Sequence, residues 1–378
     1  MRGMILFRGF LSILLIWLII KPAIAQIYKT NHYNIKLSIV ADRLNHPWGM
    51  AFLPDGSILV TERNNGSISI IENNGVVKPP IIGLPKTFIS GQGGMLDVAI
   101  DPSFTLNNLI YFSYAEPSSN GAGTAVARGR LDSKNNKISN LKVIFRQFPK
   151  SRGGRHFGSR IAISSKGELF ITVGDRGEYE RVQSFKINRG QVIRLTRNGN
   201  IPIDNPFIGN PDYRSEIWSV GHRNPQGAAI HPDTGMLWIN EHGARGGDEV
   251  NIVFPGRNYG WPIISYGTHY SGAKIGVGTH IDNMEQPIHY WDPSIAPSGM
   301  TFYTGEKFPK WQGNAFIGAL KGRLLVRLKI KNNKVILEEH ILRTLKARIR
   351  DVKNGPDGNL YILTDTNPGK IIKIEPVK

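Results

Sequence analysis

The chain has 378 residues, a formal net charge of +18, 40% hydrophobic residues and 20% charged residues. This balance is typical of a packed globular protein and excludes an intrinsically disordered chain. The sequence contains no cysteine, which excludes disulfide bonds, thiolate metal sites, cysteine nucleophiles and iron–sulfur clusters.

The first 25 residues have the pattern of a secretory signal peptide. Arg2 and Arg8 precede an apolar run, Gly9 to Ile20, and Ala23-Ile24-Ala25 supplies a small-x-small cleavage pattern. The run is shorter than the roughly 20 residues of a comfortable membrane span, although Lys21 leaves an uncleaved anchor as the alternative. Removing these 25 residues and their three cations leaves 353 residues with a charge of +15. We therefore expect an exported, periplasmic protein whose mature chain has no membrane span.

The rest of the chain repeats one phrase, a turn of Pro-Asp-Gly type followed by an apolar alternating strand. It occurs at 53–61, 101–113, 165–173, 231–240, 310–318 and 355–364. Sustained helical periodicity is hard to find between these copies. The copies lie roughly 50 to 70 residues apart, close to the length of a four-stranded propeller blade with loop insertions.

The repeats predict an all-β protein, a six-bladed β-propeller of four-stranded antiparallel blades. One blade cannot bury both faces of its sheet, so neighbours must stack, and closing the ring covers the terminal edges. Residues 26–378 would form this single domain because no linker or low-complexity segment interrupts them. A pair of β-sandwiches or a β-helix is the alternative, and the uneven repeats disfavour the β-helix.

Polar clusters next to glycines lie between the repeats, where the loops of a propeller gather at one mouth of its channel. In chain order they are Gly91–Asp97, Arg152–Arg160, Gly174-Asp175, Gly221–Gly227, Asn240–Glu249, Asn258–Trp261, Tyr290–Ser298, Leu320–Gly322 and Arg348–Asp351. These clusters are the candidate functional residues.

Each cluster also has a purely structural interpretation. Gln92 could cap a turn, His156 could be a solvated loop histidine, and Asp175 could cap the turn after its strand. Arg348 and Arg350 alternate as residues on the solvent face of a strand do. The Tyr-Gly-Trp and Tyr-Trp-Asp clusters are typical of packing between blades. No single cluster decides the function.

Together, in their fixed order, the motifs resemble those of the soluble quinoprotein aldose sugar and glucose dehydrogenases. The matching motifs are Gly-Gln-Gly-Gly at 91–94, Arg-His-Phe-Gly at 155–158, Val-Gly-Asp at 173–175, Gly-His-Arg-Asn-Pro-Gln-Gly at 221–227, Asn-Tyr-Gly-Trp-Pro at 258–262, Trp-Asp-Pro-Ser-Ile-Ala-Pro-Ser-Gly at 291–299 and Arg-Ile-Arg-Asp-Val at 348–352. The resemblance runs from about Leu44 to Pro376, and the block at 221–227 is its most specific part. It implies a six-bladed propeller that uses pyrroloquinoline quinone (PQQ).

The resemblance also implies how the cofactor is held. PQQ carries three carboxylates and an o-quinone, so its pocket needs fixed cations and hydrogen-bond donors. By motif position, Lys321, Arg348 and Arg350 would hold carboxylates and quinone oxygens, and Gln92, Arg223 and Asn224 would surround the reactive carbonyl edge.

A calcium ion belongs to the same expectation. The main-chain carbonyls of Gly243 and Ala244 would bind it, and Asp248 would reach its waters, so that Ca²⁺ polarises the quinone. Glu249 and Tyr259 are the positions where a further, structural Ca²⁺ is expected.

The resemblance assigns catalysis to His156, Asp175 and Arg223. His156 would take the proton of the anomeric hydroxyl, Asp175 would hold its other ring nitrogen, and Arg223 with Ca²⁺ would stabilise the developing oxyanion. An aldose would become a lactone, and the electrons would pass to an external acceptor, a periplasmic cytochrome or a quinone. Arg155 stands where the glucose-dehydrogenase branch has an acid, which favours the broader aldose branch and leaves the preferred sugar open.

Two other classes of function compete with this interpretation. One is a propeller that only binds glycans or a protein, and the other is a calcium-dependent lactonase, since propellers host many functions. Nucleic-acid binding is disfavoured despite the basic charge, because the chain has an export signal and no reading motif. The sequence does not distinguish a monomer from a homodimer.

Overall fold

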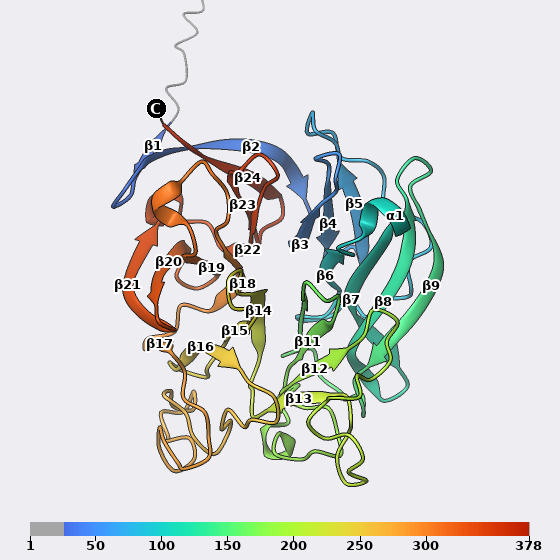
Figure 1. Cartoon of the computed structure of the whole chain (residues 1–378), viewed down its shortest axis with the longest axis vertical. Coiled ribbons are helices and arrows are strands. Elements are labelled where there is room, and N and C mark those ends of the chain that lie inside the picture. Colours follow the sequence, from blue (N-terminus) through green and yellow to red (C-terminus); the bar gives the residue numbers. More distant parts are fainter. Residues whose placement is uncertain (1–25, 378) are drawn as a thin grey trace, which may run out of the picture.

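The computed structural model describes residues 26–377, which form six sheets arranged in a ring around a central axis (Figure 1). The predicted signal peptide, residues 1–25, lies outside the described residues. Within this part of the chain, helical structure is limited to α1 (Phe104–Asn107) and the short 3-10 turns η1 (Tyr179–Arg181), η2 (Pro309–Trp311) and η3 (Arg343–Leu345). None of these helices is long and apolar enough to cross a membrane.

The blades follow one another along the chain. Blade 1 contains β3 (Pro47–Phe52), β4 (Ile58–Glu62) and β5 (Ser67–Ile71); blade 2 contains β6 (Met95–Ile100), β7 (Leu109–Ser118), β8 (Gly121–Asp132) and β9 (Lys137–Arg146); blade 3 contains β10 (Gly158–Ile163), β11 (Leu169–Val173), β12 (Gln191–Leu195) and β13 (Ile217–Val220). Blade 4 contains β14 (Pro225–Ile230), β15 (Leu237–Glu241), β16 (Asp248–Val253) and β17 (His289–Trp291); blade 5 contains β18 (Pro297–Phe302), β19 (Ala315–Ala319), β20 (Leu324–Lys331) and β21 (Lys334–Ile341); blade 6 contains β22 (Ile349–Asn354), β23 (Leu360–Thr364) and β24 (Gly369–Pro376), completed by β2 (Asn34–Leu44) and β1 (Ile27–Lys29).

The ring closes by pairing the two ends of the described chain. Strand β2 runs antiparallel to β24, with Leu37 opposite Ile374, so that an N-terminal strand becomes part of the last blade (Figure 1). This pairing covers an edge that would otherwise be free to pair with another chain. The predicted six-bladed propeller of antiparallel blades is confirmed.

Blade 1 differs from the regular pattern because only three of its strands form a continuous ladder. Its fourth position is filled by residues 77–82, where Val77 bridges to Ile71 and the amides of Lys78 and Ile81 donate to β5. Pro79 and Pro80 lie between these contacts, and a proline has no amide hydrogen to continue a ladder.

Stacking of the blades explains why the strands are apolar on both faces. In β23, Leu360 and Ile362 pack in one core cluster with Phe316 of blade 5, whereas Tyr361 and Leu363 pack in another with Met50 of blade 1. Successive side chains of a strand point to opposite faces of its sheet. Each blade packs between two neighbours, so its strands bury the side chains on both faces. This is the physical reason for the continuous apolar runs in the repeats.

The antiparallel order places the connections on two faces of the ring. Connections between blades, and those after the second strand of each blade, lie on one face, which we call the mouth face. The turns after the first and third strands lie on the opposite face. Gln92, His156 and Arg223 lie between blades, and Asp175 and Lys321 follow second strands, so all of them share the mouth face.

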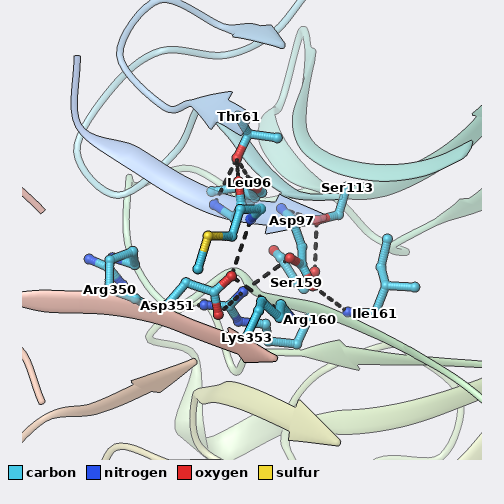
Figure 2. A network of polar contacts seen from close by, with 12 residues as sticks. Thr61, Leu96, Asp97, Ser113, Ser159, Arg160, Ile161, Arg350, Asp351 and Lys353 are labelled. Atoms are coloured by element: carbon cyan, nitrogen blue, oxygen red, sulfur yellow. Dashed lines mark hydrogen bonds and ion pairs between the residues drawn. The ribbon is translucent and has the colours of Figure 1, made fainter. Parts of the chain in front are cut away.

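A buried arginine connects the blades at the centre of the ring (Figure 2). Arg160 on β10 contacts Asp97 and Asp351 at 3.0 and 3.1 Å, and these carboxylates come from blades 2 and 6. Its Nε and Nη2 donate to the carbonyls of Gln226 and Arg350 at 2.7 and 3.0 Å. One guanidinium therefore links four blades beneath the mouth.

Candidate active site

Two adjoining cavities open on the mouth face. The inner cavity has a volume of about 170 Å³, and Trp48, Asn224 and Arg350 are among the residues that line it. The outer cavity has a volume of about 530 Å³ and is lined by residues that include His156, Arg223 and Lys321. Gln92 and His242 line both, so the two cavities form one cleft.

The predicted base and its partner meet in this cleft. His156 Nδ1 lies 2.7 Å from Asp175 Oδ1, although the two residues come from different connections. Asp175 is 1% exposed, and its carboxylate also accepts hydrogen bonds from the Gly177 amide at 2.6 Å and from Trp261 Nε1 at 3.0 Å. With Nδ1 engaged, Nε2 of His156 is the ring nitrogen left to face the cleft.

The surroundings of this pair set its protonation. Burial lowers the pKa of His156 below its ordinary value of 6.5, and the charges of Arg223 and Arg155 lower it further against the opposing effect of Asp175. Burial by itself would raise the pKa of Asp175, but the hydrogen bond and charge of His156, together with Arg223, hold it below its usual value. A neutral imidazole beside an ionised carboxylate is the arrangement that a general base needs.

Local backbone geometry positions His156. Its φ of 55° lies in the left-handed region, and its amide donates to Gln92 Oε1 at 2.7 Å. Gly174 passes so close to it that a Cβ there would lie 2.1 Å from the His156 carbonyl oxygen. The glycine before Asp175 is therefore required by a close approach of two connections.

The inner cavity is lined by cations. Arg350 is 5% exposed, and its Nη2 and Nη1 donate to Asp365 at 2.7 Å and to Gln226 at 3.1 Å. Arg348 reaches the same Asp365 oxygen at 3.2 Å, and His46 lies 3.1 Å from the other oxygen. Burial would raise the pKa of Asp365, but the charges of Arg350 and Arg63 hold it well below its ordinary range. The interpretation of Arg350 as a residue on a solvated strand face is wrong.

The remaining predicted cofactor residues lie in the same cleft. Asn224 Oδ1 accepts a hydrogen bond from the Gly158 amide at 3.1 Å, next to the His156 segment. Lys321 is exposed on the turn after β19, where its amide donates to the Ile295 carbonyl. Arg223 Nη1 donates to the carbonyls of His242 and Gly243. The structure therefore brings the predicted PQQ ligands to one cleft.

The predicted calcium loop lies at the outer cavity, which Gly243, Ala244 and Asp248 line. Asp248 accepts hydrogen bonds from the amides of Gly243 and Ala296, both at 2.8 Å, so its carboxylate holds the loop in shape. The Gly243 carbonyl accepts Arg223 Nη1. Among residues 26–377, no group of three His, Asp or Glu side chains is arranged to hold a metal.

Glu249 and Tyr259 line neither cavity. The Tyr259 hydroxyl donates to the Ile252 carbonyl at 2.6 Å and accepts the Phe254 amide at 2.9 Å. Glu249 accepts Asn251 Nδ2 at 3.1 Å, and burial, with the nearby charge of Glu241, raises its pKa to about 8. These two residues belong to the interior of blade 4 and its outer loop.

Three residues at the site lay outside the candidate clusters: Trp48 and Arg63, which line the inner cavity, and Asp365, which pairs with Arg350. His242 and Trp261 lay within two of the clusters, but the motifs assigned them no role. The repeat could have identified Asp365. This residue directly follows β23, the second strand of blade 6, just as Asp175 closely follows β11, the second strand of blade 3. His242 is a neutral imidazole, since burial and then Arg223 and Arg350 lower its pKa to about 3, and its Nε2 lies 2.8 Å from the Pro297 carbonyl.

Comparison with known proteins decides the family. The profile of the Glucose / Sorbosone dehydrogenase family matches residues 44–373. The chain belongs to this family. It is 43% identical to aldose sugar dehydrogenase YliI of Escherichia coli (strain K12), over 91% of this chain and 93% of that protein. The family membership makes it an oxidoreductase and confirms the resemblance on which the residue assignments rest.

Solved structures of the family have the same fold. The apo-form of the soluble aldose sugar dehydrogenase from Escherichia coli superposes with a TM-score of 0.88 at 43% identity, covering 91% of this chain and all of that one. The PQQ-bound form of aldose sugar dehydrogenase from Streptomyces coelicolor superposes with a TM-score of 0.75 at 26% identity, covering 90% of this chain and 98% of that one.

Proposed function

We propose that this protein oxidises aldose sugars at C1 to lactones, using PQQ and Ca²⁺. One observation carries the proposal: His156, paired with Asp175, lines the outer cavity, and Arg348 and Arg350 line the inner cavity that adjoins it. A neutral base next to a cationic cavity fits a reaction in which a sugar gives a proton to the base and a hydride to an anionic cofactor held by the arginines.

The donor set of the cleft, which the two cavities form together, fits PQQ. Arg223 Nε and Arg350 Nε are buried and have no hydrogen-bond partner among the described residues, so the cleft offers unused cationic donors to a planar anion. Lys321, Arg348 and Arg350 would hold its carboxylates, while Gln92, Arg223 and Asn224 would border its reactive edge. When bound, PQQ supplies an electrophilic carbonyl that accepts a hydride from C1 of the sugar.

The residues of the chain supply the acid–base chemistry. His156 Nε2 takes the proton of the anomeric hydroxyl, and the ionised Asp175 keeps the Nδ1 proton in place and stabilises the imidazolium that forms. Arg223 places a positive charge where negative charge develops on the sugar oxygen. The electrons then pass to an external acceptor, a cytochrome or a quinone.

The carbonyl and carboxylate oxygens of Gly243, Ala244 and Asp248 at the outer cavity are ligands that suit a hard cation such as Ca²⁺. The Gly243 carbonyl accepts Arg223 Nη1, so this side chain would move away when the ion binds. Asp248 is already hydrogen-bonded to the loop, which supports a contact through water. Glu249 and Tyr259 stay the positions proposed for a structural ion. We also propose that residues 1–25 direct export to the periplasm.

Stopped-flow reduction of bound PQQ by an aldose, without any acceptor, tests the role of His156. His156→Ala should slow this step by about 10²- to 10⁴-fold, the usual contribution of a general base, while PQQ affinity changes little. The wild-type rate should fall as pH drops through the pKa of His156, which lies below 6.5, because imidazolium cannot accept a proton.

His280→Ala is the matched control, since that histidine is 65% exposed and outside the cleft. It should reduce its PQQ at the wild-type rate. A His156→Ala enzyme that did the same would remove His156 from the mechanism. Chelation of the metal should abolish activity and added Ca²⁺ should restore it; full activity in demetallated protein would contradict the calcium proposal.

A further inference from the structure

A group of basic residues surrounds the mouth of the cleft. Six cations lie on mouth-face connections that line or flank the two cavities. We call them the basic rim: Arg63, Arg152, Arg155, Arg245, Lys321 and Arg323. They come from blades 1 to 5, so the rim surrounds the opening.

Most of the rim cations are exposed to solvent and have no carboxylate partner among residues 26–377. Arg152, Arg155, Arg245, Lys321 and Arg323 are exposed, and Arg63 is partly exposed. No ion pair among residues 26–377 includes any of the six, whereas Arg181 on the same face pairs with Glu178 and Arg348 with Asp365. The exposed acids on the mouth-face connections are fewer, namely Glu180 and Asp292.

The opposite face has a different character. Its turns expose acids and lysines side by side: Asp55, Asp204, Asp233, Glu306 and Asp357 with Lys134, Lys166, Lys307 and Lys310. The turns of the opposite face therefore carry charges of both signs, whereas the connections around the mouth carry mainly positive charge. Clustered charge of one sign around a cleft focuses the electrostatic field and attracts partners of opposite sign.

We propose that the basic rim is the docking surface for an acidic redox protein that accepts electrons from the reduced enzyme. This rests on the proposed function. Oxidation of one aldose delivers two electrons and two protons to the cofactor; the electrons leave singly to two successive acceptor molecules, and the protons go to water. The inner cavity adjoins the outer cavity, and residues of mouth-face connections line both, so an acceptor protein would reach the reduced cofactor over the rim.

Charge complementarity identifies this occupant. An acidic surface on the acceptor would be steered to the rim, and such steering raises association rates by about 10- to 10³-fold at low ionic strength. Transient complexes between redox proteins bury less than about 1,200 Å². The surface around one cleft is large enough for an interface of this size. Basic acceptors would be repelled.

One c-type cytochrome in two charge forms tests the proposal. The native basic cytochrome and its succinylated form, whose lysines carry carboxylates, are each mixed with PQQ- and Ca²⁺-loaded enzyme already reduced by an aldose. At low ionic strength the succinylated form should be reduced at least about 10-fold faster, and the difference should shrink in 0.5 M salt, where the Debye length falls to a few Å. Equal rates, or a faster native form, would overturn the proposal.

Two double variants with the same change in net charge locate the effect. Arg152→Glu/Arg323→Glu should slow reduction of the succinylated cytochrome several-fold, while Lys134→Glu/Lys307→Glu on the opposite face should leave it unchanged. Both should reduce PQQ with an aldose at the wild-type rate. If the two variants slow the cytochrome equally, net charge alone acts and the docking surface is excluded.

Binding to apoprotein separates this proposal from the function on which it rests. Calorimetric titration with the succinylated cytochrome should show salt-sensitive binding that the rim variant loses and the control variant keeps. If no aldose reduces the loaded enzyme but this binding is found, the proposed function fails and the docking surface stands. If the rim residues bind vesicles of anionic lipid and not the cytochrome, a membrane occupies the surface and the proposal is wrong.

Discussion

Arg160 and Arg350 are two buried arginines in contact with each other, but they differ in their partners and in their access to the cleft. Arg160 Nη2 donates to the Arg350 carbonyl at 3.0 Å, and both guanidinium groups lie over the ring of Trp48, at 4.1 and 5.7 Å. Arg160 meets two carboxylates and two carbonyls and lines neither cavity. Arg350 shares one carboxylate with Arg348, has a free Nε and lines the inner cavity.

The difference distinguishes a cation that holds the fold from one that is kept for a ligand. A buried charge with a full set of partners stabilises the native state and has nothing left to offer. A buried cation whose donor at a cavity has no partner lowers the stability of the unliganded protein, and that donor can bind an anion. The following changes test this distinction, beginning with the largest expected effect.

Arg160→Leu should destabilise the apoprotein by about 3–5 kcal/mol, because Asp97 and Asp351 would stay buried without their cation. Urea unfolding of the apoprotein measures this loss. Arg350→Leu, the matched change one residue from Asp351, should cost clearly less, since Asp365 keeps Arg348 and His46. Equal losses for the two variants would remove the distinction.

Arg350→Leu should instead weaken PQQ binding by about 2–5 kcal/mol, since a buried carboxylate of the ligand would lose its partner. Fluorescence titration of apoprotein with PQQ in the presence of Ca²⁺ gives the dissociation constants. Arg146→Leu, which removes an exposed pair with Glu116 on blade 2, is the control and should leave the affinity unchanged. Normal PQQ affinity in Arg350→Leu would show that the free donor has no ligand.

Asp365→Asn should cost about 1–3 kcal/mol at pH 7, since it removes a charged acceptor from both arginines. The pKa of Asp365 is depressed in the folded protein, so its contribution is present above pH about 4 and is lost as pH falls further. The difference in unfolding free energy between wild type and variant should therefore shrink below pH 4. A difference that stays constant down to pH 2 would show that the charge of Asp365 does not stabilise the cluster.

Trp48→Phe should have the smallest effect, about 0.5–1 kcal/mol of stability, because a weaker ring quadrupole would face Arg160. Chemical denaturation of the apoprotein measures it. Trp311→Phe is the comparison, since that tryptophan is 1% exposed and packs among aromatic rings. If Trp48→Phe no longer lowers the free energy of unfolding in an Arg160→Leu background, the two side chains interact.

The amino-acid sequence by itself determined the repeating unit and the order of the motifs. Turn residues and alternating apolar runs are local signals, and six copies of them predicted six blades. The loop residues that the motifs identified, including Gln92, His156 and Lys321, share the mouth face because each follows a strand of known direction. For the same reason the fold could be predicted before any contact between blades was known.

Only the tertiary structure decided what holds those residues in place. Trp261 reaches Asp175 from 86 residues away, and Arg160 reaches the Arg350 carbonyl across 190 residues. Strand β2 joins β24 only when the ring closes, and Asp365 meets His46 through that closure. Such contacts depend on the curvature of the ring and on which blades become neighbours. A local pattern does not contain them, which is why the motifs identified the residues of the cleft and the His156–Asp175 pair but not Trp261, Asp365 and His46, which orient these residues.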